Sequence, residues 1–331
     1  MRRRTAPPKR EGNVGAAIGA VLPLAVGGAV LLQMPMVGTL RPAEAPPSAN
    51  VAPLPVAPPP APLTPEAIAT ALAPAPPSSA TPACLARFKV DRPVQRGTPT
   101  ARRETLICRR GYVLAYDIDT RDPDWVMERL SPGDLTGPAH RSDAFGHDPV
   151  LPPGVDASNG DYISSGYDRG HQAPAGDAKF QQAIMDQSFF FSNMAPQRGI
   201  GFNRGAWAYL EETVRAWVKC GGHPDLHVIT GPIYGDRPGT IGSDHVSVPT
   251  SFFKIVYETN SGRAVGFVLP NRKIGSTLPN LQDYVKPIAW IETETGLAFF
   301  SGLDRRKQAQ LKNTPGTAWA HVDTCPGEGS D

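Results

Sequence analysis

The chain has 331 residues, with 33 Lys and Arg against 31 Asp and Glu, so its formal net charge is +2. Hydrophobic residues make up 40% of the sequence, which is enough for a packed core and excludes a wholly disordered chain. The 37 prolines exceed average usage and are unevenly spread, so the chain divides into segments of different character.

The first 41 residues predict a targeting segment. Basic residues gather before position 11, and residues 12–40 contain no charge. Such a run can cross a bilayer, for which about 20 apolar residues suffice. We favour a signal anchor over residues 1–41 that holds the rest of the chain outside the cytoplasm, in the periplasm or extracellular space. Two alternatives stay open: a secreted protein with a signal peptide cleaved near Ala43-Glu44-Ala45, and a mitochondrial presequence leading to the intermembrane space.

Residues 42–83 predict a disordered linker. Pro and Ala occupy 27 of these 42 positions, and the segment has no Lys or Arg. It shows no apolar periodicity, so it cannot bury enough surface to offset the entropy lost on ordering. Its prolines favour a partly extended spacer that tethers the rest of the chain.

Residues 84–331 then form the predicted globular domain. They contain 27 Lys and Arg and 28 Asp and Glu, so the net charge is 27 − 28 = −1. Proteins that bind phosphate backbones usually carry a basic surface. The charge total therefore does not indicate a nucleic-acid-binding domain, although a neutral total can contain a local cluster of arginines.

All four cysteines fall in this domain, at Cys84, Cys108, Cys220 and Cys325. An even number of cysteines in an exported domain favours disulfides, and four cysteines allow three pairings. We expect the first to pair with the second and the third with the fourth. The rival interpretation is a zinc site formed by Cys220-x-x-His223 and His321-x-x-x-Cys325.

Apolar and β-branched runs between glycines and prolines predict several strands, while one segment has helical spacing. In residues 204–219 the side chains of Trp207, Leu210, Val214 and Trp217 recur every three or four positions, and Asn203 stands where an N-cap residue is expected. The pattern predicts an α+β domain built on a mainly antiparallel sheet. The expected strands cover residues 111–118, 188–193, 226–230, 251–257 and 264–269, with a short helix or strand at 125–130.

The polar residues with chemical potential concentrate between positions 168 and 211. Asp168-Arg169-Gly170-His171 places an acid, a guanidinium and an imidazole within four residues, and Asn203 and Glu211 follow. Hydrolysis of a phosphodiester needs a base active near neutral pH, which suits histidine, and a cation to meet the charge on the phosphate. Mg²⁺ prefers oxygen ligands and keeps several waters, so a few protein ligands suffice.

Helix geometry limits how this ion would be held. Eight residues of helix rise about 12 Å, so Asn203 and Glu211 are not expected to bind one ion directly together. If both serve the metal, Asn203 binds it directly and Glu211 acts through a coordinated water. Taken singly, each of these residue types more often has a structural role than a catalytic one.

Three segments together resemble the DNA/RNA non-specific endonuclease family, which includes Serratia nuclease and mitochondrial endonuclease G. They are Asp-Arg-Gly-His-Gln-Ala-Pro at 168–174, Ser-Asn-Met-Ala-Pro-Gln at 192–197 and Phe-Asn-Arg-Gly-Ala-Trp-Ala-Tyr-Leu-Glu at 202–211. Weaker similarity extends from about residue 84 to residue 316. The resemblance implies a ββα-metal (His-Me finger) core within a larger α+β domain.

The resemblance also implies roles for individual residues. His171 matches the general base, Asn203 the one direct protein ligand of Mg²⁺, and Glu211 the carboxylate that holds one of its waters. Arg169 and Arg141 match arginines at the scissile phosphate, Asn193 a supporting residue, and Asp168 a structural residue of the motif loop. The implied activity is hydrolysis of DNA and RNA with little sequence or sugar specificity, leaving 5′-phosphate ends. Mn²⁺ is a plausible substitute for Mg²⁺, and family members often form homodimers.

Two hypotheses from other classes stay open. The first is a non-catalytic, membrane-tethered protein that binds or takes up nucleic acid, and the second is a structural surface domain in which the motif serves only packing. His171, Asn203 and Glu211 are all present, which argues against both alternatives.

Overall fold

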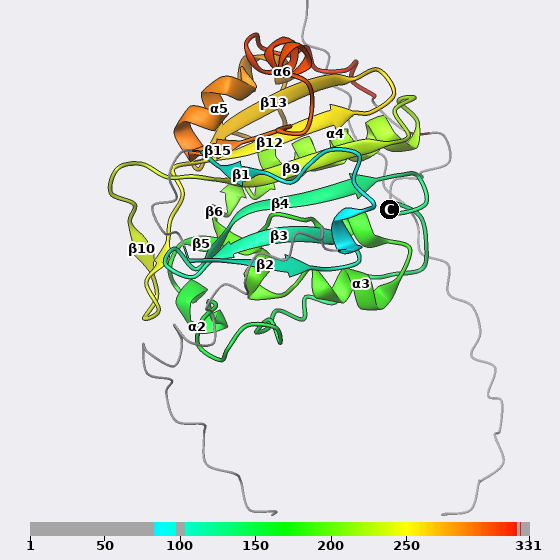
Figure 1. The fold of residues 1–331 in the computed structure, drawn as a ribbon. Coiled ribbons are helices and arrows are strands. Elements are labelled where there is room, and N and C mark those ends of the chain that lie inside the picture. Colours follow the sequence, from blue (N-terminus) through cyan, green and yellow to red (C-terminus); the bar gives the residue numbers. More distant parts are fainter. Residues whose placement is uncertain (1–82, 97–102, 323–324, 326–331) are drawn as a thin grey trace, which may run out of the picture. The chain divides into compact units, whose positions relative to one another are not determined.

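The computed structural model describes residues 83–96, 103–322 and 325 (Figure 1). The helices are α2 (Asn159–Tyr162), α3 (Gln182–Gln187), α4 (Ala206–Lys219), α5 (Ile288–Thr295) and α6 (Arg305–Lys312), with 3₁₀ turns η1 (Ala83–Leu85), η2 (Ala175–Ala178), η3 (Phe191–Asn193) and η4 (Leu281–Tyr284). The longer strands are β2 (Glu104–Cys108), β3 (Tyr112–Asp117), β4 (Asp122–Leu130), β5 (Tyr167–His171), β6 (Met194–Arg198), β9 (Leu226–Ile233), β12 (Ser251–Glu258) and β13 (Arg263–Pro270). The two-residue strands are β1 (Val94–Gln95), β7 (Ile200–Gly201), β8 (Arg204–Gly205), β10 (Thr240–Ile241), β11 (Val246–Ser247), β14 (Val285–Lys286) and β15 (Leu297–Ala298).

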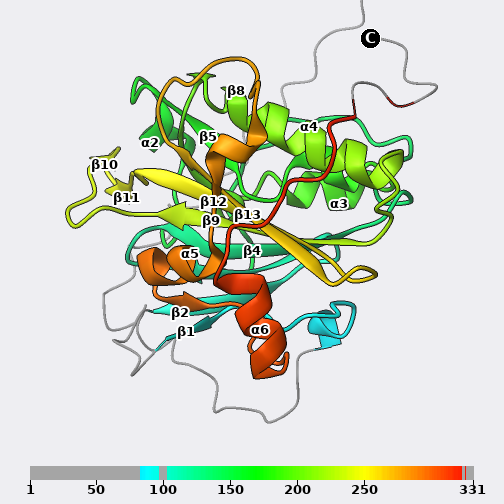
Figure 2. The same ribbon diagram turned by 90° about the horizontal axis from the view of Figure 1, so that it is seen from above.

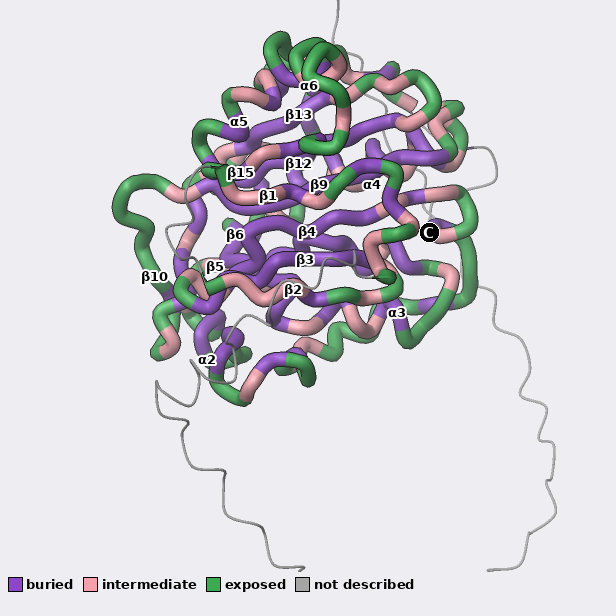
Figure 3. Tube along the Cα trace, in the orientation of Figure 1, coloured by how far each residue is buried: buried purple, intermediate pink, exposed green. Residues whose placement is uncertain are grey.

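The centre of the domain is a seven-stranded sheet with the order β14-β13-β12-β9-β4-β3-β2. Every neighbouring pair in this sheet is antiparallel. Its inner strands are buried, while exposed residues gather on α6, on the loops and around β10 (Figure 3). The predicted α+β class with a mainly antiparallel sheet is therefore confirmed.

The alternation of side chains along the inner strands gives the sheet two apolar faces. On β12, Phe252 and Val256 belong to the core beneath α4, whereas Phe253 and Ile255 belong to the core beneath α5 and α6. The helices accordingly lie on opposite sides of the sheet, with α4 on one side and α5 and α6 on the other (Figure 2). The β5–β6 hairpin lies on the α4 side.

Helix α4 is fixed to the sheet by the apolar stripe that its sequence predicts. Trp207, Leu210, Val214 and Trp217 are all at most 2% exposed. Burying each such side chain contributes roughly 1.5–3 kcal/mol relative to leaving it in water. The helix that follows Asn203 and carries Glu211 thus rests on a rigid support.

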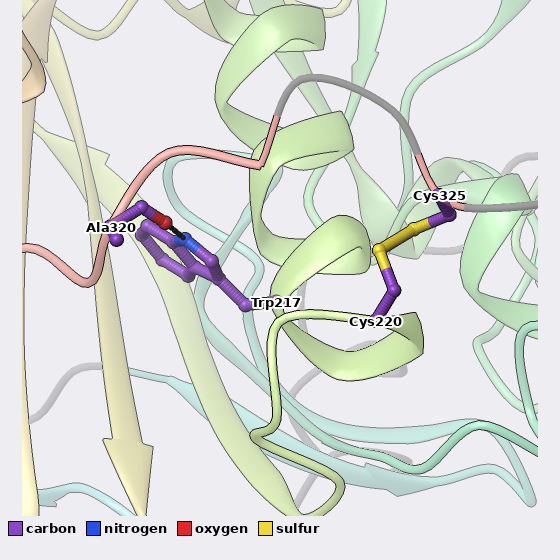
Figure 4. Close-up of a disulfide and its surroundings, with 4 residues drawn as sticks. All are labelled: Trp217, Cys220, Ala320 and Cys325. Carbon is purple, nitrogen blue, oxygen red and sulfur yellow. Dashed lines mark hydrogen bonds between the residues drawn. A yellow bond between two sulfur atoms is a disulfide. The ribbon is translucent and has the colours of Figure 1, made fainter.

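Two disulfides close the domain, with the pairing that the sequence analysis favours. Cys84 bonds to Cys108, and Cys220 at the end of α4 bonds to Cys325 (Figure 4). Beside the second disulfide, Trp217 Nε1 donates to the carbonyl of Ala320 at 2.9 Å. The rival zinc site is wrong, because its cysteines are bonded to each other and His223 pairs with the Glu258 carboxylate at 2.7 Å.

One local prediction is wrong. Residues 188–193 are not a strand, because the chain there makes the turn after α3 and then η3, and the strand begins only at Met194. In this segment Phe189 contacts the His171 ring instead of joining the sheet. For residues 125–130 the structure decides between the two predicted alternatives: they belong to strand β4.

The predicted targeting segment (residues 1–41) and all but the last residue of the predicted linker (42–83) lie outside the described residues; Ala83 begins the 3₁₀ turn η1. Within the part of the chain that the structure describes, no helix is both long enough and apolar enough to span a bilayer.

Ion pairs and a hydrogen bond attach the segment that follows Cys84 to the sheet. Lys89 Nζ and Arg129 Nε both pair with the Asp225 carboxylate, at 2.6 and 2.7 Å. The backbone N–H of Lys89 donates to Nε2 of His227, which has no exposed surface. Burial lowers the pKa of His227 from 6.5 to about 4, so the folded domain keeps this ring neutral.

We expect His227 to make the domain sensitive to acid. Because its pKa is lower in the folded chain, the unfolded chain takes up a proton between about pH 6.5 and pH 4, and stability falls as the pH falls through that window. In His227→Gln, whose amide oxygen can accept the same bond, the loss of unfolding free energy between pH 7 and pH 4 should be smaller by roughly 2–3 kcal/mol. Urea titrations with the disulfides intact measure this, and equal losses in both proteins would exclude the assignment.

Candidate active site

The β5–β6 hairpin carries the Asp-Arg-Gly-His motif into the site. The strands pair antiparallel, with His171 opposite Met194 and Gly170 opposite Ala195. A Cβ atom on Gly170 would lie 2.3 Å from the side chain of Gln197, which is fully buried. Glycine is therefore required between Arg169 and His171 for the hairpin to close at this distance.

Asn193 fixes the chain just beyond His171. Its side chain is fully buried, and its Oδ1 accepts from the Ala173 N–H at 2.9 Å. Its Nδ2 donates to the carbonyls of Ala173 and Ser188, at 2.9 and 2.8 Å. The Asn193 side chain thereby ties the segment after β5 to the turn after α3, and it does not line the cavity described below.

The imidazole of His171 sits in an aromatic enclosure. The rings of Phe145 and Phe189 approach it edge-on, with centroids at 5.7 and 4.9 Å. The Nε2 atom is buried and has no hydrogen-bond partner among the described residues. Burial, and then the charges of Arg141 and Arg169, lower the pKa of His171 to about 3, so the ring is neutral at physiological pH.

Two arginines stack on the same aromatic rings. The guanidinium of Arg169 lies 4.1 Å from the Phe145 centroid, and that of Arg141 lies 5.0 Å from the Phe189 centroid. Arg169 also donates to Asn159 Oδ1, and Arg141 pairs with Asp143 at 2.7 Å. The rings thus hold two cations beside the imidazole.

Asp168 joins the hairpin to the residues that precede α4. Its Oδ2 accepts from Asn203 Nδ2 at 3.0 Å and pairs with Arg204 Nε at 2.9 Å. The prediction that Asn203 caps the helix is wrong, because α4 begins only at Ala206 and Gly205 stands at the N-cap position. Backbone carbonyl groups accept from the first N–H groups of the helix instead, so the Asn203 side chain is not needed to cap it.

Glu211 faces the site from the second turn of α4. Its Oε1 is buried and has no hydrogen-bond partner among the described residues. Burial raises its pKa to about 7, against the opposing charges of Lys254 and Arg215. A buried carboxylate oxygen without a donor is suited to a cation or to an ordered water, because it has lost its solvent shell without replacement.

Sequence reasoning missed Arg215, which lies four residues after Glu211 on α4. Its Nη1 pairs with Asp177 of η2 at 2.9 Å, so it links the helix to the segment that follows His171. The spacing of four residues, which puts it on the same helix face as Glu211, is the signal that would have identified it.

One cavity of about 640 Å³ brings these residues together. His171, Asn203 and Glu211 all line it, and the basic residues that line it with them are Arg141, Arg169, Lys179, Arg204 and Arg215. The acidic lining residues are only Asp143 and Glu211. The domain is neutral overall, but the site itself has an excess of positive charge.

The donor set fits a hydrated Mg²⁺ better than a metal bound by many side chains. Within the described ranges, no three His, Cys, Asp or Glu residues converge as metal ligands. Asn203 Nδ2 donates to Asp168, so Oδ1 is the amide atom that could accept a cation. One amide oxygen and one buried carboxylate oxygen match an ion that retains most of its waters.

The chain is similar in sequence and in structure to known nucleases. Residues 91–306 match the family described as DNA/RNA non-specific endonuclease. A nuclease of Syncephalastrum racemosum is 37% identical over 273 residues, covering 72% of this chain and 84% of that one. Mitochondrial endonuclease G of Bos taurus is 34% identical over 226 residues, covering 64% and 74%. A crystal structure of the EndoG/EndoGI complex superposes with a TM-score of 0.57 at 33% identity, covering 64% of this chain and 91% of that one.

The family match and the named relatives define a class of enzymes that cleave nucleic acids. The chain belongs to the DNA/RNA non-specific endonuclease family, and it is a nuclease.

We expect Gly170→Ala to disable the site by steric displacement. The new methyl group would clash with Gln197, move His171, and lower kcat/KM by about 100-fold, as displacements of about 1 Å can do. The double variant Gly170→Ala, Gln197→Ala removes the clashing atoms and should regain about tenfold or more. Gln197→Ala alone is the control, and circular dichroism checks the fold. If the double variant is no better than Gly170→Ala, the clash is not the cause.

Proposed function

We propose that the chain is an endonuclease that hydrolyses phosphodiester bonds of DNA and RNA by metal-assisted attack of water, leaving 5′-phosphate ends. The observation that carries this proposal is the single cavity in which His171, Asn203 and Glu211 face two ring-stacked arginines. The family membership supports the reaction class, and the shared cavity supports the choice of residues.

In this proposal His171 takes the proton from the attacking water. The ring must be neutral to do so, and its low pKa guarantees that at physiological pH. A pKa of about 3 would make it a weak base; burial is the main cause, and the charges of Arg141 and Arg169 lower the pKa further. A bound phosphodiester brings negative charge beside both arginines, which raises the pKa of the imidazole and strengthens the base.

Arg141 and Arg169 hold the scissile phosphate. Their guanidinium groups are fixed by the rings of Phe145 and Phe189, so little side-chain entropy is lost when the phosphate binds. Guanidinium groups bind phosphate oxygens in a bidentate manner, which also orients the phosphorus for attack opposite the leaving oxygen.

Asn203 Oδ1 would hold Mg²⁺ directly, and Glu211 would hold one of its waters; Mn²⁺ is expected to substitute. The ion, when bound, supplies positive charge to the phosphate oxygens and the leaving oxygen. Asp168 orients the Asn203 amide, and Asn193 fixes the chain beyond His171. Both act on the position of other residues and not on the substrate.

The function is tested by digestion of plasmid DNA and total RNA with the purified protein, with Mg²⁺ and with EDTA. We expect both substrates to be degraded only with the metal, and end-labelling to show 5′-phosphates. Binding without metal-dependent degradation would favour the alternative of a non-catalytic, membrane-tethered binding or uptake protein.

His171→Ala should lower kcat by about 10²–10⁴-fold, because the water loses its base, while substrate affinity is kept. The rate is measured on a labelled oligonucleotide under saturating Mg²⁺. His321→Ala is the matched control, since that histidine is exposed and does not line the cavity. An active His171→Ala variant would remove the proposed base.

Asn203→Ala should act through the metal. We expect the Mg²⁺ concentration for half-maximal rate to rise by about tenfold or more, with Asn313→Ala, an exposed asparagine, unchanged. A variant of Asn203 with a normal Mg²⁺ titration would contradict its assigned role.

We further propose the organisation into a targeting segment (residues 1–41), a linker (42–83) and the nuclease domain (84–331), with the domain outside the reducing cytoplasm. Two disulfides support an oxidising location, and several relatives are named as mitochondrial proteins. Cell fractionation with protease protection, followed by non-reducing gels, tests this: a domain found reduced in the cytosol would contradict it.

A further inference from the structure

A second cavity, of about 860 Å³, adjoins the one that contains His171. The two share five lining residues, Arg141, Asp143, Arg169, Asn203 and Arg204, so they meet where the scissile phosphate is proposed to bind. Its volume lies in the range of about 300–1,000 Å³ that small-molecule sites occupy. The proposed mechanism has no use for this space.

The lining of the second cavity combines two kinds of residue. The shared part is basic, and the acids near it are paired: Asp143 with Arg141, and Asp168 with Arg204. Apart from Asn159, the rest of the lining is apolar or aromatic: Phe145, Tyr162, Ile163 and Tyr167. A nucleotide combines the same two kinds of surface, with its charge on the phosphate and its apolar faces on the base.

Ile163 is held at the edge of this cavity although 73% of it is exposed. It follows α2, whose first turn is closed by the Ser158–Asp161 capping box. The chain then turns through Ser164 and Gly166, both with positive φ, before entering β5. The Asp244 N–H donates to Asp161 at 3.0 Å and anchors α2 to the β10–β11 hairpin. The isoleucine is thus presented on a fixed turn.

Tyr167 also belongs to the apolar part of the lining, and Arg198 fixes the position of its ring. The Arg198 guanidinium lies 5.2 Å from the ring centroid, and its Nη1 donates to the Gly166 carbonyl at 3.0 Å. Arg198 is opposite Tyr167 in the β5–β6 ladder, so the hairpin itself sets this contact. A ring held in this way stacks on a base with little loss of side-chain entropy.

We propose that this cavity binds one unpaired nucleobase of the strand being cut, next to the scissile phosphate, with Ile163 and Tyr167 as its apolar contacts. The inference rests on the proposed function. A base within a duplex has both faces stacked and its edge paired, so it cannot fill a cavity lined by side chains, whereas a base in a single strand can. Contact with apolar faces does not depend on base identity, so sequence tolerance is kept.

The experiment uses the full chain and oligonucleotides with one cleavable phosphodiester. The nucleotide on one or the other side of that bond carries either a base or an abasic sugar. For the nucleotide on one of the two sides of the cleavable bond, removal of the base should lower kcat/KM of the wild type by about tenfold, mainly through a higher KM. Ile163→Ser should lower kcat/KM on the intact single strand by about fivefold but respond little to the abasic sugar. Duplex substrates should be cut more slowly than single strands and be insensitive to this substitution.

Three variants complete the test. Ile163→Phe should restore the sensitivity to the abasic sugar, and Tyr167→Leu should reduce it. Ile200→Ser is the matched control, because Ile200 is 74% exposed and lines neither cavity. An equal abasic penalty in wild type and Ile163→Ser, or no penalty on either side in the wild type, would overturn the proposal.

Binding measured by fluorescence anisotropy in EDTA separates this proposal from the proposed function. If the wild type cuts nothing, the proposed function fails, but the base-dependent difference in Kd between wild type and Ile163→Ser still decides whether the subsite exists. Equal Kd values for intact and abasic single strands would count against it in either case.

Discussion

The contact between Asp168 and the residues that precede α4 holds the two halves of the site together. The β5–β6 hairpin carries His171 and Arg169, and α4 carries Glu211 and follows Asn203, so neither element contains a complete site. The Asp168 carboxylate accepts a hydrogen bond from the Asn203 amide and forms an ion pair with Arg204. These two contacts set the distance between the hairpin and the helix. The hydrogen bond also decides which amide atom of Asn203 is left to face the cavity.

The support beneath α4 is partly polar, which is uncommon for a buried face. Lys254 on β12 is 1% exposed, donates to Thr230 Oγ1 at 2.7 Å and lies 4.9 Å from the Trp207 ring. Glu128 on β4 is also buried; burial raises its pKa well above the usual range, and the charge of Lys254 opposes that rise. Buried charges are costly unless compensated, and Lys254 likewise opposes the rise that burial imposes on the pKa of Glu211.

Much of the fold and the site followed from the sequence, for identifiable reasons. Strands such as β9 and β12 are long apolar runs, and α4 has a clear helical stripe, so local pattern sufficed. The site residues came from contiguous motifs together with the family resemblance. The strand predicted at residues 188–193 was wrong because buried aromatic residues occur in strands and turns alike. The spacing of Arg215 from Glu211 already placed both on one helix face, but the pairing of Arg215 with Asp177 depends on the folded segment after β5.

The charge of the domain illustrates the limit of composition. A net charge near zero gave no sign of phosphate binding, yet basic residues dominate the lining of the catalytic cavity. Acids elsewhere balance the total without entering the cavity, as Asp225 does with Lys89 and Arg129. Where the charges lie, and not their sum, decides whether a phosphate is attracted.

The Cys220–Cys325 bond spans 105 residues of sequence, and this bears on how the protein is made. The helix end at Cys220 cannot be clamped until residue 325 has left the ribosome. Synthesis of the sheet strands β9, β12 and β13 is complete before then. The disulfide that fixes the end of α4 can therefore form only after all the strands of the sheet have been synthesised.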